Sequence, residues 1–209
     1  SISMEKSQAS GTTLQLLGSH CPRLEYLHAP ACKGLDPVSL LKVLQGCPNL
    51  TYLDASFWMW NKTDLEPKLN KTWTASALPP KLELRQLFVC AWNVDTTMLQ
   101  LLYMRCPNLT NTDISGCPAG PELIAQTLTT HCKQLDKLVA SGFSVTDEAV
   151  EALTNECKGL RTLSITKAHD ITDLSLQSLC RSTMLTRLNC SHSPFITNEG
   201  IQMLVTAVP

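Results

Sequence analysis

Leucines recur at a nearly constant spacing along this chain, and that regularity constrains the fold more than any other feature. The steps between the first leucines of seven similar segments are 26, 34, 25, 26, 25 and 25 residues. A period of about 20–50 residues is typical of solenoids, because one unit cannot bury its hydrophobic face without stacking on its neighbours. The leucines are Leu24, Leu50, Leu84, Leu109, Leu135, Leu160 and Leu185.

Each segment combines a strand pattern with a helix pattern. Leu160, Leu163 and Ile165 follow an LxxLxL alternation, which is typical of a strand with one buried face. A Thr-Asp pair such as residues 146–147 then precedes an apolar run at helical spacing, and its side chains can accept the unpaired N–H groups of a first helical turn. The pattern predicts an α/β solenoid of about seven repeats of 25–26 residues. It would form a curved arc with a parallel β-sheet on the concave face and helices on the convex face.

The repeats predict a single domain over residues 13–209, with an insertion at about residues 56–83 that accounts for the one long step. Residues 1–12 match no repeat, and we expect a tail there, either a cloning remnant or the end of an omitted segment. Residues 14–17 would end a helix whose strand is missing. Residues 208–209 fall where a further repeat would start, so we expect a piece of a longer array or ends covered by other chains.

A cysteine precedes five of the predicted strands, often followed by proline. With the LxxLxL strand and the Thr-Asp helix start, this motif resembles the cysteine-containing class of leucine-rich repeats over about residues 14–209. That class is familiar from F-box/LRR proteins. The resemblance implies a substrate-recognition region of a ubiquitin ligase, which reaches Skp and cullin subunits through an F-box that we do not recognise in this sequence. The cysteines are Cys21, Cys47, Cys106, Cys132 and Cys157.

The same repeat class occurs in structural subunits of large ciliary and mitochondrial assemblies, and this remains the alternative. Fold resemblance alone is a weak basis for function. Both possibilities describe a non-enzymatic protein–protein interaction module or scaffold. A secreted ectodomain is a further alternative, which would use the glycosylation acceptor patterns at Asn61 and Asn70.

The ten cysteines do not form a metal-binding pattern, because the chain contains no CxxC pair. At a crowded helix-to-strand junction, a small and weakly polar thiol suits burial, so we interpret them as inert core thiols. A regulatory or paired set is the alternative. Core thiols predict an intracellular, reducing compartment, cytoplasmic or nuclear. We expect no metal and no cofactor.

Charge and motifs exclude other classes. Lys and Arg number 17 against 18 Asp and Glu, without the basic excess of a dedicated nucleic-acid binder. We find neither a run of apolar residues long enough for a membrane helix nor a recognised catalytic motif. Asp54 and Asp113 could approach one another, but solvated surface acids are the simpler interpretation. We therefore expect no enzyme, no nucleic-acid partner and no membrane partner.

The alternating strand residues predict a binding surface on the concave face. Leucines point inward, so their neighbours face solvent. The first half of this surface is aromatic and the second half is polar, and exposed aromatics in a curved groove are typical anchors for a protein partner. The alternative is that they only cover neighbouring aliphatic side chains. The candidates are Tyr26, His28, Tyr52, Asp54, Gln86, Phe88, Asn111, Asp113, Lys137 and Arg187.

The insertion and the strand after it supply a second group of candidates. A long loop that leaves the end of a solenoid strand often serves binding, and Trp is costly to expose without a partner. We expect partner contact, with packing of the insertion against its own repeats as the alternative. The candidates are Phe57, Trp58, Trp60, Trp73 and Trp92.

Overall fold

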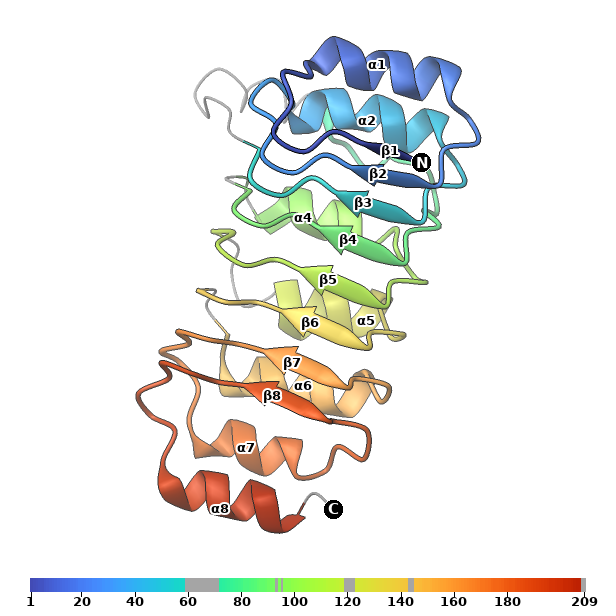
Figure 1. Cartoon of the computed structure of the whole chain (residues 1–209). Helices are drawn as coiled ribbons and strands as arrows, with labels where there is room; N and C mark the ends of the chain where they lie inside the picture. Colours follow the sequence, from blue (N-terminus) through green and yellow to red (C-terminus); the bar gives the residue numbers. More distant parts are fainter. Residues whose placement is uncertain (59–71, 93, 95, 119–122, 143–144, 208–209) are drawn as a thin grey trace.

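The computed structural model describes residues 1–58, 72–92, 94, 96–118, 123–142 and 145–207. Within them, eight parallel strands form one open sheet in chain order (Figure 1). The strands are β1 (Ile2–Ser3), β2 (Tyr26–His28), β3 (Tyr52–Asp54), β4 (Gln86–Phe88), β5 (Asn111–Asp113), β6 (Lys137–Val139), β7 (Thr162–Ser164) and β8 (Arg187–Asn189).

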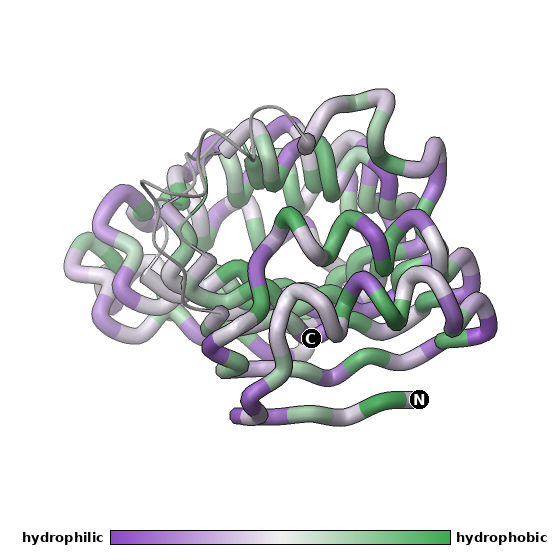
Figure 2. The backbone as a smooth tube through the Cα atoms, turned by 90° about the horizontal axis from the view of Figure 1, so that it is seen from above, coloured by the Kyte–Doolittle hydropathy of each residue, from purple (hydrophilic) through white to green (hydrophobic). Residues whose placement is uncertain are grey.

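Helices follow the strands along the chain and form a second layer behind the sheet (Figure 1). The view down the stack from its N-terminal end shows hydrophobic and hydrophilic residues alternating along both layers (Figure 2). No helix among the described residues has the length and apolar character needed to span a membrane. The helices are α1 (Gly11–His20), α2 (Pro37–Gly46), α4 (Thr96–Tyr103), a π-helical turn η1 (Leu123–Leu128) that runs into α5 (Thr129–His131), α6 (Asp147–Glu156), α7 (Asp173–Leu179) and α8 (Asn198–Ala207).

The core lies between the two layers and is built from equivalent residues of successive repeats. The central residue of each strand pairs in register with the next, as in Leu27 with Leu53 and Leu53 with Leu87, and these three are fully buried. Strands are spaced about 4.8 Å apart and packed helices about 8–10 Å, so the sheet side of the stack is the shorter one. The predicted α/β solenoid is confirmed.

The turn after each strand has the same backbone conformation in every repeat. The third residue beyond the strand adopts a positive φ, a region that favours glycine, although most repeats place another residue there. In the first seven repeats its N–H donates to a carbonyl of the next repeat, as from Ala31 to Ser56 at 2.8 Å. This second ladder fixes the register beside the sheet. The residues are Lys6, Ala31, Phe57, Ala91, Gly116, Gly142, Lys167 and His192.

The first strand corrects one expectation from the sequence. Residues 14–17 belong to α1, and the strand expected to be missing is β1, which pairs Ile2 with Leu27. Ile2 and Met4 pack against the core. The sequence pattern missed this repeat because its strand has two residues and carries no LxxLxL alternation.

The described end of the insertion packs on the convex side. The indole Nε1 of Trp73 donates to the carbonyl of Pro37 at 2.9 Å, at the start of α2. Near the end of the same helix, the Gln45 side chain donates to the carbonyl of Ala77 at 2.8 Å. Trp73 and Ala77 therefore lie against α2, and Ala75 and Leu82 bond to Arg105 beyond α4, whereas residues 59–71 lie outside the described part of the chain.

Candidate protein-binding face

The solvent side of strands β2–β8, here called the β face, carries two rows of side chains in register. The first residues of the strands form the amino row and the third residues form the carboxyl row. All ten concave-face candidates lie in these rows, and none of them is fully buried. The amino row is Tyr26, Tyr52, Gln86, Asn111, Lys137, Thr162 and Arg187. The carboxyl row is His28, Asp54, Phe88, Asp113, Val139, Ser164 and Asn189.

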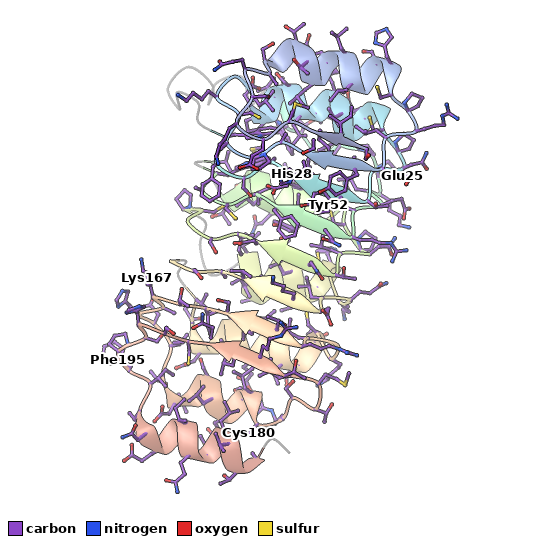
Figure 3. The ribbon with its side chains drawn as sticks, in the orientation of Figure 1. Glu25, His28, Tyr52, Lys167, Cys180 and Phe195 are labelled. Carbon is purple, nitrogen blue, oxygen red and sulfur yellow. The ribbon has the colours of Figure 1, made fainter. Side chains whose placement is uncertain are left out.

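An aromatic cluster occupies the β face over β2–β4. The rings of Tyr26 and Tyr52 stack with centroids 4.1 Å apart, and Phe88 lies 5.6 Å from Tyr52 in a tilted arrangement. His28 lies 6.3 Å from Tyr52, and both are seen on the sheet in Figure 3. The register makes this cluster, since neighbouring strands place equivalent side chains about 5 Å apart. Its rings remain half-buried, with surface left for contact.

Polar contacts orient the cluster. Nδ1 of His28 lies 3.3 Å from Oδ2 of Asp54 and 3.5 Å from the hydroxyl of Tyr52. Burial, together with hydrogen bonding and the nearby Asp54 charge, raises the pKa of Tyr52 well above its ordinary value. Tyr52 is therefore a neutral donor and acceptor at physiological pH, and the cluster offers aromatic area with polar edges.

Two carboxylates flank the Phe88 ring. In the carboxyl row, Phe88 pairs with Asp54 on one side and with Asp113 on the other. One oxygen of each carboxylate accepts the N–H two residues on, from Ser56 at 3.0 Å and from Ser115 at 2.9 Å, which fixes its orientation. The sequence allowed these two acids to approach one another on the surface, and the register places them on either side of Phe88.

The other half of the β face is a shallow hollow with two cations. It has a volume of about 610 Å³ and includes Lys137, Thr162, Ser164 and Arg187 in its lining. Lys137 and Arg187 are exposed, and the salt bridges of the described residues include neither of them. The small side chains of Thr162 and Ser164 line the hollow between these two cations. The β face therefore changes from acidic and aromatic to basic and polar along the stack.

Three of the five insertion-group candidates are buried, which corrects the expected partner contact. Trp58, Trp73 and Trp92 are 2%, 5% and 0% exposed. The indoles of Trp58 and Trp92 donate to the carbonyls of Ala29 and Ala55, each at 2.6 Å. Their hydrogen-bonding and packing capacity is used within the chain, so the alternative of self-packing holds for these three.

The physical reason is repeat position. Trp58 and Trp92 lie four residues beyond the strand end, where other repeats have Cys32 and Cys117. Those thiols donate to equivalent carbonyls of the preceding repeat at 2.8 and 3.1 Å. The same alignment could have identified Trp58 as a core residue from the sequence, since Ala55 precedes it as Ala29 precedes Cys32.

Phe57 is the insertion-group candidate that stays on the surface. Its side chain is 54% exposed, and its backbone has a φ of 59°, a conformation that is unfavourable for a bulky residue. Trp60 lies outside the described residues. Phe57 therefore leaves an exposed ring in the turn after β3.

All ten cysteines carry free thiols, seven of them buried. Burial raises the pKa of Cys132 and Cys90 to about 12, and it raises the pKa of Cys106 well above its ordinary value. Protonated thiols are poor nucleophiles and poor metal ligands. Among the described residues, no group of three or more His, Cys, Asp or Glu side chains is arranged to hold a metal ion.

A scan of the sequence against models of known protein families finds no match. The repeat pattern and the geometry of the β face are therefore what support a function.

Proposed function

We propose that this chain is a protein–protein interaction module that binds its partner on the β face. The observation that carries the proposal is the aromatic cluster, in which the half-buried rings of Tyr26 and Phe88 both pack on Tyr52. Large amphipathic rings held by neighbours supply contact area at low cost in conformational entropy. No chemistry by the chain itself is needed.

The resemblance of the repeats supports a more specific role. In F-box/LRR proteins the repeat arc holds the substrate of a ubiquitin ligase, and this chain would do the same with the β face. Skp and cullin would be reached through a region outside this sequence. In this role, the β face of the present chain would supply the substrate-binding surface.

A structural subunit is the second candidate, and exposed apolar residues on the last helices favour it. Leu174 of α7 and Val205 of α8 are 60% and 71% exposed, and Ile201 is 40% exposed. Apolar residues gathered on a helical surface are typical of a contact between subunits. In such an assembly these helices, rather than the β face, would make the main interface.

Affinity purification of the full-length gene product from its source cells, with quantitative mass spectrometry, tests both. The Tyr26→Ala/Phe88→Ala variant removes two rings of the cluster, and Phe195→Ala removes a 58% exposed ring that belongs to neither row of the β face. We expect partners that are depleted at least fivefold by the first variant and retained by the second, on the scale of a hot-spot loss of about 1–2 kcal/mol.

Each result has a definite meaning. Skp and cullin subunits among the recovered proteins would support the ligase role. A stoichiometric set of partner proteins that is lost with Val205→Asp, yet retained with Tyr26→Ala/Phe88→Ala, would support the role of a structural subunit. If all partners are recovered with Tyr26→Ala/Phe88→Ala as fully as with the Phe195→Ala control, binding on the β face is refuted.

A further inference from the structure

The β face presents two oppositely charged seats, and their separation matches an extended peptide. The first seat is Phe88 between Asp54 and Asp113, and the second is Thr162 between Lys137 and Arg187. Each seat spans three adjacent strands and centres on an uncharged side chain. Their opposite signs indicate the chemistry of what would bind there.

The first seat suits a basic side chain. The α-carbons of Asp54 and Asp113 are about 10 Å apart, twice the spacing of neighbouring strands, with the Phe88 ring between them. An ammonium or guanidinium group over this ring would gain a cation–π contact and the attraction of both carboxylates. One oxygen of each carboxylate is held by a backbone N–H. The other oxygen of Asp54, whose side chain is 14% exposed, lies 3.3 Å from Nδ1 of His28, so a basic group would share this carboxylate with His28. The seat is therefore largely pre-oriented.

The second seat suits a carboxylate. Lys137 and Arg187 flank Thr162 in the amino row at the same spacing of about 10 Å. The hollow of about 610 Å³ above Thr162 and Ser164 leaves room for an acidic side chain to approach both cations. The salt bridges of the described residues involve neither cation, so binding would not break an ion pair within that part of the chain.

The distance between the seats sets the spacing of the two charges. Phe88 and Thr162 lie three strands apart, about 14 Å, and two residues apart along the strand direction, about 7 Å. The diagonal is about 16 Å, which an extended chain covers in about five residues. A folded partner surface could match this distance, but an extended segment does so without any special fold.

We propose that the β face binds an extended partner segment with a basic and an acidic side chain about four or six residues apart, so that both point to the same side of the segment, the first on Phe88 and the second over Thr162. This inference rests on the proposed function and adds the chemistry of the partner. A nucleic acid fits poorly, because its phosphates would meet Asp54 and Asp113, and the net charge of the chain is −1.

Selection from a random peptide library of about twelve residues, an extended length sufficient to cover both seats, tests the proposal on the 209-residue chain. The enriched peptides are synthesised with a fluorescent label, and their dissociation constants are measured by anisotropy at low and high salt. Asp54→Asn/Asp113→Asn and Lys137→Gln/Arg187→Gln neutralise one seat each. Asparagine keeps the oxygen that accepts the Ser56 and Ser115 N–H groups, so the first variant preserves the local turn.

We expect enrichment of peptides with a basic and an acidic residue about four or six positions apart, the even separations nearest to the diagonal of about 16 Å. Each neutralised seat should weaken binding at least about fivefold, and only for peptides that keep the matching charge. Added salt should weaken binding by the wild-type chain more than binding by either variant.

Two outcomes would overturn the proposal, and they separate it from the proposed function. Peptides that are lost on Tyr26→Ala/Phe88→Ala, yet bind both neutralised variants as tightly as wild type, would refute the charged seats and leave the β face as the binding surface. Enriched peptides that bind the aromatic variant unchanged would refute both.

Discussion

The carboxylate of Asp147 accepts hydrogen bonds from both the backbone N–H and the hydroxyl of Thr172, at 2.9 and 2.7 Å, across one whole repeat. Asp173 does the same for Thr197 in the following repeat, at 2.9 and 2.6 Å. Each aspartate lies in the first turn of its own helix, and each threonine precedes the next helix. The Thr-Asp pair that marks a helix start in the sequence therefore also links one repeat to the next.

Removing Asp147 should destabilise the fold more than a local helix cap would. The Asp147→Ala variant loses the bonds to Thr172 and also those from the N–H and hydroxyl of Ser175. We expect a loss of about 2–3 kcal/mol, because part of this network is buried and its donors would be left unpaired. Urea unfolding followed by circular dichroism measures it. The control is Glu148→Ala, at an exposed neighbour in the same turn, and equal losses for the two variants would contradict the interpretation.

The same ladder predicts a loss of stability in acid. Burial alone would raise the pKa of Asp147, but hydrogen bonds from Ser175 and Thr172 outweigh it and lower the pKa. Hydrogen bonds from Thr197 likewise lower the pKa of Asp173. A group whose pKa is lower in the folded state stabilises the fold above its unfolded pKa of about 4 and loses that contribution as the pH falls through the folded pKa.

Unfolding free energies measured from pH 7 to pH 2.5 in wild type and in Asp147→Asn/Asp173→Asn test this prediction, over a range that spans the ordinary pKa of aspartate. Glu151 and Arg181 pair with one another and are common to both proteins. Glu199 shares the Thr197 hydroxyl with Asp173, so Glu199→Gln is introduced into both proteins before they are compared. The unfolding free energy of wild type should exceed that of the variant at neutral pH, and this difference should narrow below about pH 4. A gap that stays constant over the whole range would show that the charge of these carboxylates is not what stabilises the ladder.

Close helix packing at the N-terminal end depends on two glycines. A Cβ at Gly46, the last residue of α2, would overlap the carbonyl oxygen of Gly18 in α1, and backbone cannot move aside cheaply. We expect Gly46→Ala to lower the melting temperature and to cost about 2–3 kcal/mol, as overpacking does in a tight core. Gly159→Ala is the matched control, because its Cβ would sit 3.7 Å from the nearest backbone atom. Equal stability of the two variants would show that α1 and α2 can separate freely.

The repeat period made most of the fold predictable. Burial of one strand face imposes an alternation with a period of two, and stacking repeats this alternation in every unit. The strands can therefore be recognised from the buried residues Leu27, Leu53 and Leu87. The rows of the β face follow from that register. β1 was missed because Ile2–Ser3 is too short to show any period.

Contacts that depend on the identity of a neighbour in another repeat were not predictable from the pattern. Thr112 occupies a leucine position in β5, and its hydroxyl meets that of the buried Tyr103 at 2.8 Å and donates to the carbonyl of Leu87 at 2.7 Å. By contrast, the position of Phe88 between Asp54 and Asp113 does follow from the register, although the two acids are 59 residues apart in the sequence.

Trp58 and Phe57 are adjacent in the sequence but should respond to substitution in opposite ways. Trp58→Ala removes a buried indole and its bond to the Ala29 carbonyl, so we expect a loss of about 3–5 kcal/mol in unfolding free energy. Phe57→Gly relieves a positive φ at an exposed position and should stabilise the fold by up to about 1 kcal/mol. Thermal unfolding of both variants measures the difference in their stabilities. Trp92→Phe, which keeps a large buried ring at the equivalent position of the next repeat, should fall between them. If Trp58→Ala unfolds at the wild-type temperature, the indole does not stabilise the core, and the result would favour the partner contact that the sequence predicted for Trp58.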